Sequence, residues 1–506
     1  METLLDRYAS KIVGTLGCFD RVVIQGTLPR LCYADGMASL LWSRGIKLFD
    51  YPKFAEPFRD QIRANAEALA KEASIKVEFM TKTASRKDDR IAEILKERGD
   101  HPGLVAILSA MEACHTYRPW HDKQTGKTCL KPDMGKCLHC YFYFLDPEVG
   151  LCYVRVPTWC PFRLQFYFNG HNQLAAKLHK AGIAYRMMDN AFSQIADPEK
   201  AQKLSDDLDV AKLHAMLDRY ATQCCPPVTT LETCYHWSLM QVEYSTDIVF
   251  KHQSDLKPLY DTISRTAIHA VKADNVATFL GRKLHGNFKD ELGNNFSTRI
   301  EGTRIKHHMG SASIKMYDKA GLILRIETTA NDVSFFKHHR VVEQRDGTNA
   351  FKLAPLKKSI YSLGDLRDLV AAANRRYLEF ISALEDPSSG GKALQKITGP
   401  VTEDGRRYRG FNFFSKDDGL LLKVISRGEF TITGLRNKDL QRHLPGKDPA
   451  WISRCLKRLR VHGLIKRVGK TYKHYLTDLG KRAILGGLKF IEMTLVPTLA
   501  AAPSFV

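Results

Sequence analysis

Short apolar runs and amphipathic segments alternate along the first part of the chain. Each apolar run has the length of a strand, and the segment after it keeps its apolar residues at helical spacing. Strands separated by helices in this way favour a parallel sheet that is covered by helices. We therefore expect an α/β domain over residues 1–112. The expected strands are 19–26, 75–80 and 103–110, and the expected helices are 34–45, 54–72 and 85–99.

The middle of the chain changes to strands in which polar and apolar residues alternate. Segments 136–146 and 150–159 show this alternation and flank the turn sequence DPEVG, which predicts a β-hairpin. A helix is expected at 171–182, and polar sequence of helical character follows it. We assign residues 113–230 to a β-hairpin plus a helical region.

An antiparallel meander is expected inside residues 231–386, between helices. Its strands are joined by the short turns MGS and KAG, and a long amphipathic helix follows them. We therefore expect an α+β domain over this range. The strands are expected at 296–308, 313–319 and 322–329, and the helices within 256–284 and over 363–385.

The segment DPSSGG begins a stretch of turn composition, so residues 387–415 are expected to form a linker. Residues 416–490 then follow the order helix, short strand, helix, basic helix, β-hairpin, helix. Residues 491–506 are expected to be a loosely held tail. The predicted fold is thus a multidomain α+β protein with an N-terminal α/β layer, central antiparallel sheets with helices, and a C-terminal winged helix.

The third helix of the C-terminal segment is apolar on one side and basic on the other. Ile452, Cys455 and Leu459 keep core spacing, and Asp448 is placed to cap the helix. The sequence WISRCLKRLRVHGLIKRVGKTYKHYLTDLGKRA resembles MarR-like winged-helix domains. The resemblance implies that this helix docks in the DNA major groove and that the hairpin contacts phosphates. The nucleic-acid-binding residues expected here are Trp451, Arg454, Lys457, Arg458, Lys466, Arg467, Lys470 and Lys473.

The whole chain carries a formal charge of +21, which favours a polyanionic partner. We find no continuous apolar run of about 18 residues and no signal-peptide core, so we expect a cytoplasmic protein without a membrane partner. The twelve cysteines are scattered, and we expect no disulfide framework.

The sequence IKMYDKAGLILRIETT is the strongest candidate for chemistry. Strand alternation places Lys315 and Tyr317 on one face, and Arg325 and Glu327 on one face of the next strand. Tyr317 is a candidate nucleophile, and Glu327, with Asp318 or an aspartate from elsewhere, is a candidate Mg²⁺ ligand. The alternative is a charge ladder on a solvated sheet. Basic residues of this region add expected nucleic-acid contacts: Arg304, Lys306, Lys315 and Arg325.

This stretch resembles the YDK…LRIE strand pair of rolling-circle replication initiators. The resemblance implies a tyrosine nucleophile and a metal ion. The His-hydrophobic-His metal motif of those initiators is missing from this sequence, where His307 and His308 are adjacent. The resemblance therefore leaves the metal ligands open.

A second candidate site lies in the first domain. Asp20 stands at the start of an expected strand and Glu112 follows another, where metal-dependent nucleases of RNase H-like folds hold their ions. Local pairing of Asp20 with Arg21 is the alternative. Zinc is not favoured at Cys137 and Cys140, because residues three apart on a strand point to opposite faces.

Together these patterns predict a nucleic-acid-binding protein, and first a DNA-processing protein of a mobile-element or replication type. Metal-dependent cleavage or transfer of phosphodiester bonds is its expected chemistry if it is an enzyme. Two alternatives remain open: a non-enzymatic winged-helix transcription regulator, and an RNA-binding protein that forms a ribonucleoprotein with a structured RNA.

Overall fold

The computed structural model describes residues 3–81, 86–231, 233–283, 291–299, 302–385, 387–469 and 471–500. The chain divides into two compact units, Met1–Glu385 and Asp386–Val506. Each unit has its own hydrophobic core.

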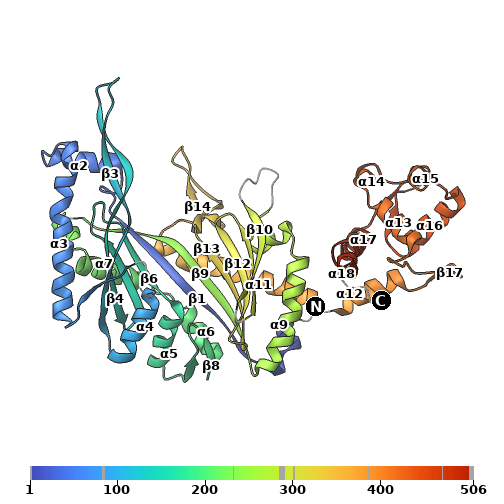
Figure 1. Cartoon of the computed structure of the whole chain (residues 1–506), viewed down its shortest axis with the longest axis horizontal. Helices are drawn as coiled ribbons and strands as arrows, with labels where there is room; N and C mark the ends of the chain where they lie inside the picture. Colours follow the sequence, from blue (N-terminus) through green and yellow to red (C-terminus); the bar gives the residue numbers. More distant parts are fainter. Residues whose placement is uncertain are drawn as a thin grey trace. The chain divides into compact units, whose positions relative to one another are not determined.

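One sheet of 11 strands organises the N-terminal unit (Figure 1). Its strand order is β10-β11-β12-β13-β9-β1-β6-β5-β4-β3-β2. The strands are β1 (Ile12–Thr27), β2 (Val77–Phe79), β3 (Gly103–His121), β4 (Thr128–Asp146), β5 (Gly150–Pro157), β6 (Leu164–Phe168), β9 (His236–Phe250), β10 (Leu292–Arg299), β11 (Gly302–Met309), β12 (Ala312–Lys319) and β13 (Ile323–Ala330).

The sheet corrects the predicted parallel layer. β2 and β3 pair in parallel, but β1 lies between β6 and β9 and pairs antiparallel with both. The three predicted body segments, 1–112, 113–230 and 231–386, all contribute strands to this one sheet rather than to separate sheets. The alternation of strands and helices suggests that the helices after β1 connect neighbouring parallel strands. In the structure they do not.

One face of the sheet packs against long helices and forms the main core. α11 (Leu363–Glu385) lies against β9 and β13 and also packs on α9 (Gln253–Ala270). α3 (Tyr51–Glu72) lies against β3 and also packs on α7 (Val210–Cys224). These helices bury the alternate residues of the strands, for example Ile326 and Val242. This unit also contains α1 (Leu4–Arg7), α2 (Ala34–Ser43), α8 (Pro227–Thr230) and α10 (Ala273–Phe279).

The opposite face, which carries Lys315, Tyr317, Arg325, Glu327 and Asp247, is called the site face. These residues share a face because they pair in register across β12, β13 and β9. Smaller elements cover parts of the site face. α5 (Gly170–Lys180) and α6 (Pro198–Asp206) pack on β1, α4 (Lys87–Arg98) packs on β3, and the hairpin β7 (Tyr185–Met187)–β8 (Phe192–Ile195) lies beside β9.

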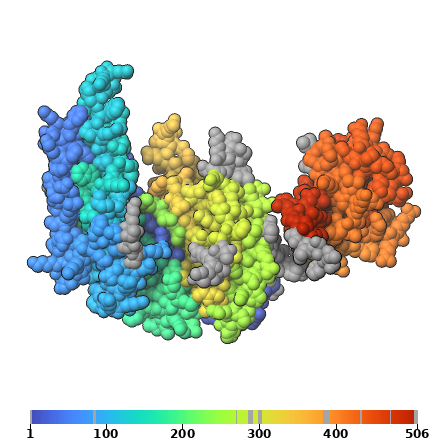
Figure 2. All heavy atoms as spheres, in the orientation of Figure 1, coloured from blue at the N-terminus to red at the C-terminus, as the bar shows by residue number. Residues whose placement is uncertain are grey.

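Two hairpins extend from the N-terminal unit. β3 and β4 continue as a two-stranded arm that ends between His121 and Thr128, beyond the part of β4 that pairs with β5. Figure 2 shows this arm, in cyan, standing out from the body. A second hairpin is formed by β14 (Lys337–Glu343) and β15 (Asn349–Pro355). Both hairpins carry exposed apolar side chains, among them Trp120 and Phe351.

The C-terminal unit contains the predicted helices and the predicted hairpin, but a helix stands where a short strand was expected after the first helix, and the predicted linker is structured. Residues 387–415 form α12 (Pro387–Thr398) and a hairpin of β16 (Val401–Glu403) and β17 (Arg406–Tyr408). The elements that follow are α13 (Lys416–Ile425), α14 (Gly428–Thr433), α15 (Asn437–His443), α16 (Pro449–Val461), β18 (Ile465–Arg467), β19 (His474–Leu476) and α17 (Asp478–Phe490).

Helical structure continues from α17 into the predicted tail, through Ile491–Leu495 to α18 (Val496–Ala500). The combined segment Asp478–Ala500 is long and apolar enough, by length and composition alone, to cross a membrane. Its first part belongs to the core of the C-terminal unit, where Ile484 is fully buried.

Candidate metal centre

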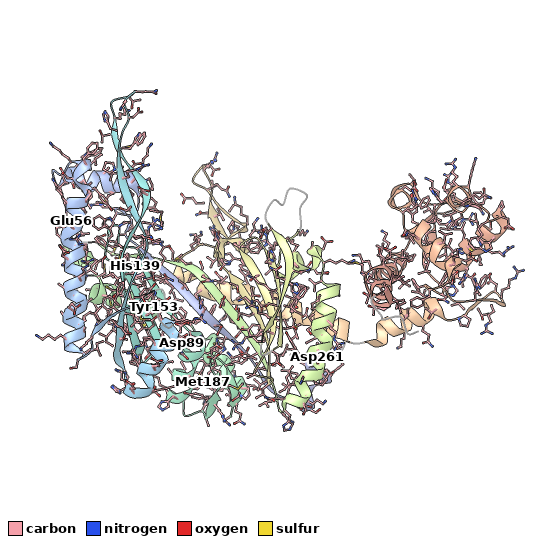
Figure 3. The ribbon with its side chains drawn as sticks, in the orientation of Figure 1. Glu56, Asp89, His139, Tyr153, Met187 and Asp261 are labelled. Carbon is pink, nitrogen blue, oxygen red and sulfur yellow. The ribbon has the colours of Figure 1, made fainter. Side chains whose placement is uncertain are left out.

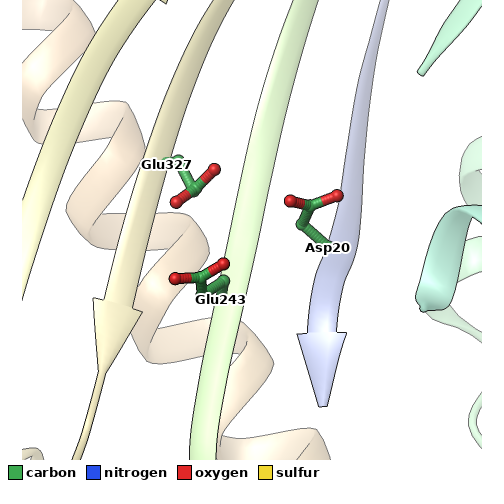
Figure 4. A group of neighbouring side chains, drawn as sticks. All are labelled: Asp20, Glu243 and Glu327. Carbon is green, nitrogen blue, oxygen red and sulfur yellow. The ribbon is translucent and has the colours of Figure 1, made fainter. Parts of the chain in front are cut away.

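Three carboxylates from three adjacent strands meet on the site face. Asp20 lies on β1, Glu243 on β9 and Glu327 on β13, and one ligand oxygen from each lies within 4.8 Å of the others. Figure 4 shows the three side chains on separate strands, with a helix behind the sheet. This is the one group of three or more candidate metal ligands in the described part of the chain.

A β-bulge brings Asp20 into this group. Phe19 pairs with Tyr244 and Arg21 pairs with Glu243, so Asp20 is an extra residue without a partner on β9. A bulge of this kind re-aims the side chains beside it. Asp20 and Arg21 consequently both lie toward the site face, and Asp20 is 8% exposed.

The start of α5 and the β7–β8 hairpin hold Asp20 in place. Asn169 caps α5 and donates from Nδ2 to the backbone carbonyl of Asp20 at 2.6 Å. Asn190 donates to Asp20 Oδ1 at 2.6 Å, and His171 Nδ1 lies 3.3 Å from the same oxygen. Burial opposes the charge of Asp20, but the contact with His171 and the nearby charge of Arg325 lower its pKa well below the usual value.

A buried ion pair lies beneath the carboxylates. Arg325 donates from Nε and Nη2 to the two carboxylate oxygens of Asp247 at 2.6 and 2.7 Å. Arg325 is fully buried, which corrects its predicted role as a nucleic-acid contact. Its Nη1 makes no hydrogen bond to any residue that the structure describes and lies 3.4 Å from Asp20 Oδ1. Arg325 therefore orients the carboxylates of Asp247 and Asp20 and is not available to a substrate.

Lys315 and Tyr317 share the carboxylate of Glu327. Lys315 Nζ lies 2.5 Å from Glu327 Oε1 and 3.3 Å from Glu243 Oε1. The Tyr317 hydroxyl donates to Glu327 Oε2 at 2.7 Å. Burial and the charge of Glu327 raise the pKa of Tyr317 above its usual value, so its phenol is neutral in this state.

The donor set suits a hard divalent cation. Carboxylate oxygens are the ligands that Mg²⁺, Mn²⁺ and Ca²⁺ prefer. Asp247 adds a fourth carboxylate to the three already named, and Arg21, Lys315, Arg325 and Lys319 lie near enough to offset this charge. The case for a cation therefore rests on the oxygen ligands themselves. The buried carboxylate group can therefore bind a metal ion.

Two other predicted catalytic residues lie outside this group. Glu112 is on β3, separated from β1 by β6, β5 and β4, and it binds Lys87, Arg155 and Tyr141 instead. Asp318 pairs in register with Leu324 and so lies on the helix-covered face. Strand alternation separates Asp318 from Glu327, and distance across the sheet separates Glu112 from Asp20.

The predicted contacts on β11 and β12 lie on the site face. Lys306 pairs in register with Lys315, and Arg304 lies two residues before it on the same face. Both β11 side chains are partly exposed. They extend the basic character of the sheet away from the carboxylates.

The C-terminal unit corrects the role predicted for one arginine. Arg458 is 7% exposed and forms a bidentate ion pair with Asp418, with both nitrogen–oxygen distances at 2.8 Å. Lys457 forms an ion pair with Glu403 of the β16–β17 hairpin. Arg454 remains exposed on α16.

The other predicted contacts of this unit lie around α16 and the β18–β19 hairpin. Lys466 and Arg467 are exposed on β18, Lys473 is partly exposed, and Trp451 packs beneath Lys447, whose Nζ lies 4.8 Å from the ring centroid. Lys470 lies outside the described residues. Together with Arg454, these positions form a basic surface around α16 and the hairpin.

Sequence reasoning missed Glu243, Asp247 and His171. The first two stand on β9, in the sequence HWSLMQVEYSTDIVF, where period-two alternation places 243, 245 and 247 on one face. That alternation was the available signal. His171 gave no such signal, because its contact with Asp20 depends on how α5 docks on the sheet.

Comparison with protein-family models, with curated proteins and with solved structures finds no significant match.

Proposed function

We propose that the protein cleaves or transfers phosphodiester bonds of nucleic acid at the group Asp20, Glu243 and Glu327, with Mg²⁺ as the cofactor. The observation that carries the proposal is the meeting of three carboxylates with a tyrosine hydroxyl 2.7 Å from one of them. Carboxylates on neighbouring strands are a common way to hold the cation of a phosphoryl-transfer site.

Mg²⁺, when bound, supplies Lewis-acid polarisation of a phosphoryl oxygen. The residues of the chain supply the ligands and the surrounding charge. Glu243 and Glu327 already share Lys315, so a cation competes with the lysine ammonium for these oxygens. A displaced Lys315 would remain beside the site and stabilise negative charge on a substrate phosphate.

Tyr317 is the proposed nucleophile. Its hydroxyl proton points at Glu327 Oε2, which can accept that proton as the oxygen attacks phosphorus. The bond from Tyr317 Oη to phosphorus would form, the bond to the leaving ribose oxygen would break, and that oxygen would take a proton from solvent. A water molecule in place of Tyr317 would give hydrolysis at the same site.

The C-terminal unit is proposed as the second nucleic-acid contact. Its order of helices and hairpin supports the winged-helix prediction, and Arg454 and Lys466 are exposed on the predicted contact elements. The two contacts together suit a DNA-processing protein of a mobile-element or replication type. RNA as the substrate, or gene regulation without cleavage, are the competing outcomes of the test below.

The test is cleavage of end-labelled random-sequence pools of DNA and RNA by the full chain, with Mg²⁺ or with EDTA. Cleavage is expected in Mg²⁺ alone and is expected to fall at least about 100-fold in Asp20→Asn. Glu112→Gln is the matched control, because Glu112 is a partly buried carboxylate on the same sheet that lies away from the group. Binding without cleavage by the wild-type protein, or equal cleavage by Asp20→Asn, would refute the proposal.

A further inference from the structure

A row of side chains leads away from the carboxylates across β1, β6 and β5. The guanidinium carbon of Arg21 lies 5.6 Å from the ring centroid of Tyr167. The rings of Tyr167 and Tyr153 are stacked, with centroids 4.9 Å apart and planes 21° from parallel. Register places all three residues on the site face. Figure 3 labels Tyr153 within the sheet.

Among the cations beside the carboxylates, Arg21 makes the weakest contact with them. Its side chain is 46% exposed, and its contact with Glu243 is an ion pair of 3.8 Å rather than a hydrogen bond. Lys315 and Arg325, in contrast, donate hydrogen bonds to carboxylates at 2.5 and 2.6 Å. Arg21 is thus the site cation that is available to a phosphate from outside the protein.

The row continues to a polar cavity of about 120 Å³ on the same face. His139 lines the cavity and is 1% exposed. Its Nδ1 lies 3.2 Å from the carbonyl oxygen of Cys137, and its Nε2 makes no hydrogen bond to any residue in the described part of the chain. Gln25, Gln165 and Arg163 line the same cavity, and Arg163 Nε is buried without a hydrogen-bond partner in that part.

These groups have the chemistry of a nucleotide-binding surface. Tyr153 stacks on the Tyr167 ring and the Arg21 guanidinium lies over it, so Tyr167 can receive the flat face of a base once Arg21 turns to bind a phosphate. The ring and amide groups of the cavity can meet base edges. Gln25 lies five residues after Asp20, about 17 Å along β1 at the usual rise of a strand. The surface is therefore long enough to receive bases that flank a phosphate at the carboxylates.

We propose that the substrate is a single-stranded nucleic acid, bound along the site face with a base stacked on Tyr167, a phosphate on Arg21 and a flanking base in the cavity beside His139. The proposal rests on the proposed function and names its substrate class. A single strand is required because the bases of a duplex are paired and stacked on one another. A duplex base therefore has no free face that could stack on Tyr167.

Photocrosslinking tests this proposal without cleavage. The full chain is irradiated with a single-stranded oligothymidylate that carries 5-iodouracil, in EDTA, and crosslinked peptides are mapped by mass spectrometry. A crosslink within residues 164–168 is expected, reduced at least about tenfold in Tyr167→Leu and retained in Tyr167→Phe. Tyr33→Leu is the control for an exposed tyrosine outside the row.

The crosslink is also expected to be competed by unlabelled single strands and not by duplex of the same sequence. Crosslinks confined to residues 416–490, an unchanged yield in Tyr167→Leu, or competition by duplex would overturn the proposal. Because the assay contains no divalent cation, a crosslink at Tyr167 without any cleavage in Mg²⁺ would refute the proposed function alone. Cleavage in Mg²⁺ without this crosslink would refute the single-strand surface alone.

Discussion

Tyr317 on β12 donates a hydrogen bond of 2.7 Å to Glu327 on β13, diagonally across the strand pair, since Tyr317 itself pairs in register with Arg325. The phenol and its proton acceptor are therefore fixed by adjacent strands of one sheet. The proposed role of Tyr317 as a nucleophile rests on this contact.

Substitution of Tyr317 separates covalent transfer from hydrolysis. Tyr317→Phe is expected to abolish any covalent adduct between protein and nucleic acid, because it removes the attacking oxygen and leaves the ring. The measurement is the retarded band on a denaturing gel, with the adducted peptide identified by mass spectrometry. Persistence of an adduct in Tyr317→Phe would assign the nucleophile to another residue, and Mg²⁺-dependent cleavage by Tyr317→Phe would assign it to water.

Removal of Lys315 is expected to tighten cation binding. Its ammonium contacts Glu327 and Glu243, so Lys315→Met frees two ligand oxygens and removes a repelling charge. We expect a fall of about tenfold in the Kd for Mn²⁺, measured by titration. Lys306→Met is the matched control, since Lys306 pairs with Lys315 on β11 and has no ion pair with these carboxylates. Weaker binding in Lys315→Met would contradict the competition between lysine and cation.

The two arginines of α16 are expected to behave differently. Arg458→Ala leaves Asp418 buried without its partner, and should lower the free energy of unfolding of the C-terminal unit by about 3–5 kcal/mol. Arg454→Ala should leave the unfolding transition unchanged and weaken nucleic-acid binding. Thermal unfolding and fluorescence anisotropy distinguish the two effects. A stable Arg458→Ala variant would show that the ion pair does not hold this unit together.

Glu112 is expected to make stability depend on pH. Burial opposes its charge, but hydrogen bonds from Lys87 and Tyr141 and the charge of Arg155 lower its pKa to about 2. A carboxylate whose pKa is lowered on folding stabilises the fold above its unfolded pKa, near 4.3, and loses that contribution as pH falls toward about 2. The contribution is on the order of 2–3 kcal/mol at neutral pH. The free energy of unfolding, measured from pH 6 to pH 3, should fall less steeply with pH in Glu112→Gln than in the wild type.

The predictions that the structure confirms concern features that are set by residues close together in the sequence. Strand alternation correctly placed Lys315 and Tyr317 together, and helical spacing correctly placed Ile452 and Leu459 in the core of the C-terminal unit. The same rules gave the wrong pairing for β1, because the order of strands in a sheet depends on contacts between distant segments.

The candidate site shows the same limit. Asp20 and Glu327 were predicted in separate sites, and neither residue's sequence neighbourhood indicates that β9 joins their strands. The bulge that aims Asp20 appears only when β1 is aligned with β9. Burial of Arg458 and Arg325 was also out of reach, because each depends on an aspartate from another element, Asp418 and Asp247.

Titration of Mn²⁺ into the full chain, followed by electron paramagnetic resonance of the free ion, tests the central claim most directly. The wild type is expected to bind one cation per chain at the carboxylate group, Glu243→Gln to bind it at least about tenfold more weakly, and Glu112→Gln to bind as the wild type does. Equal binding by the wild type and Glu243→Gln would contradict the assignment of Asp20, Glu243 and Glu327 as a metal centre.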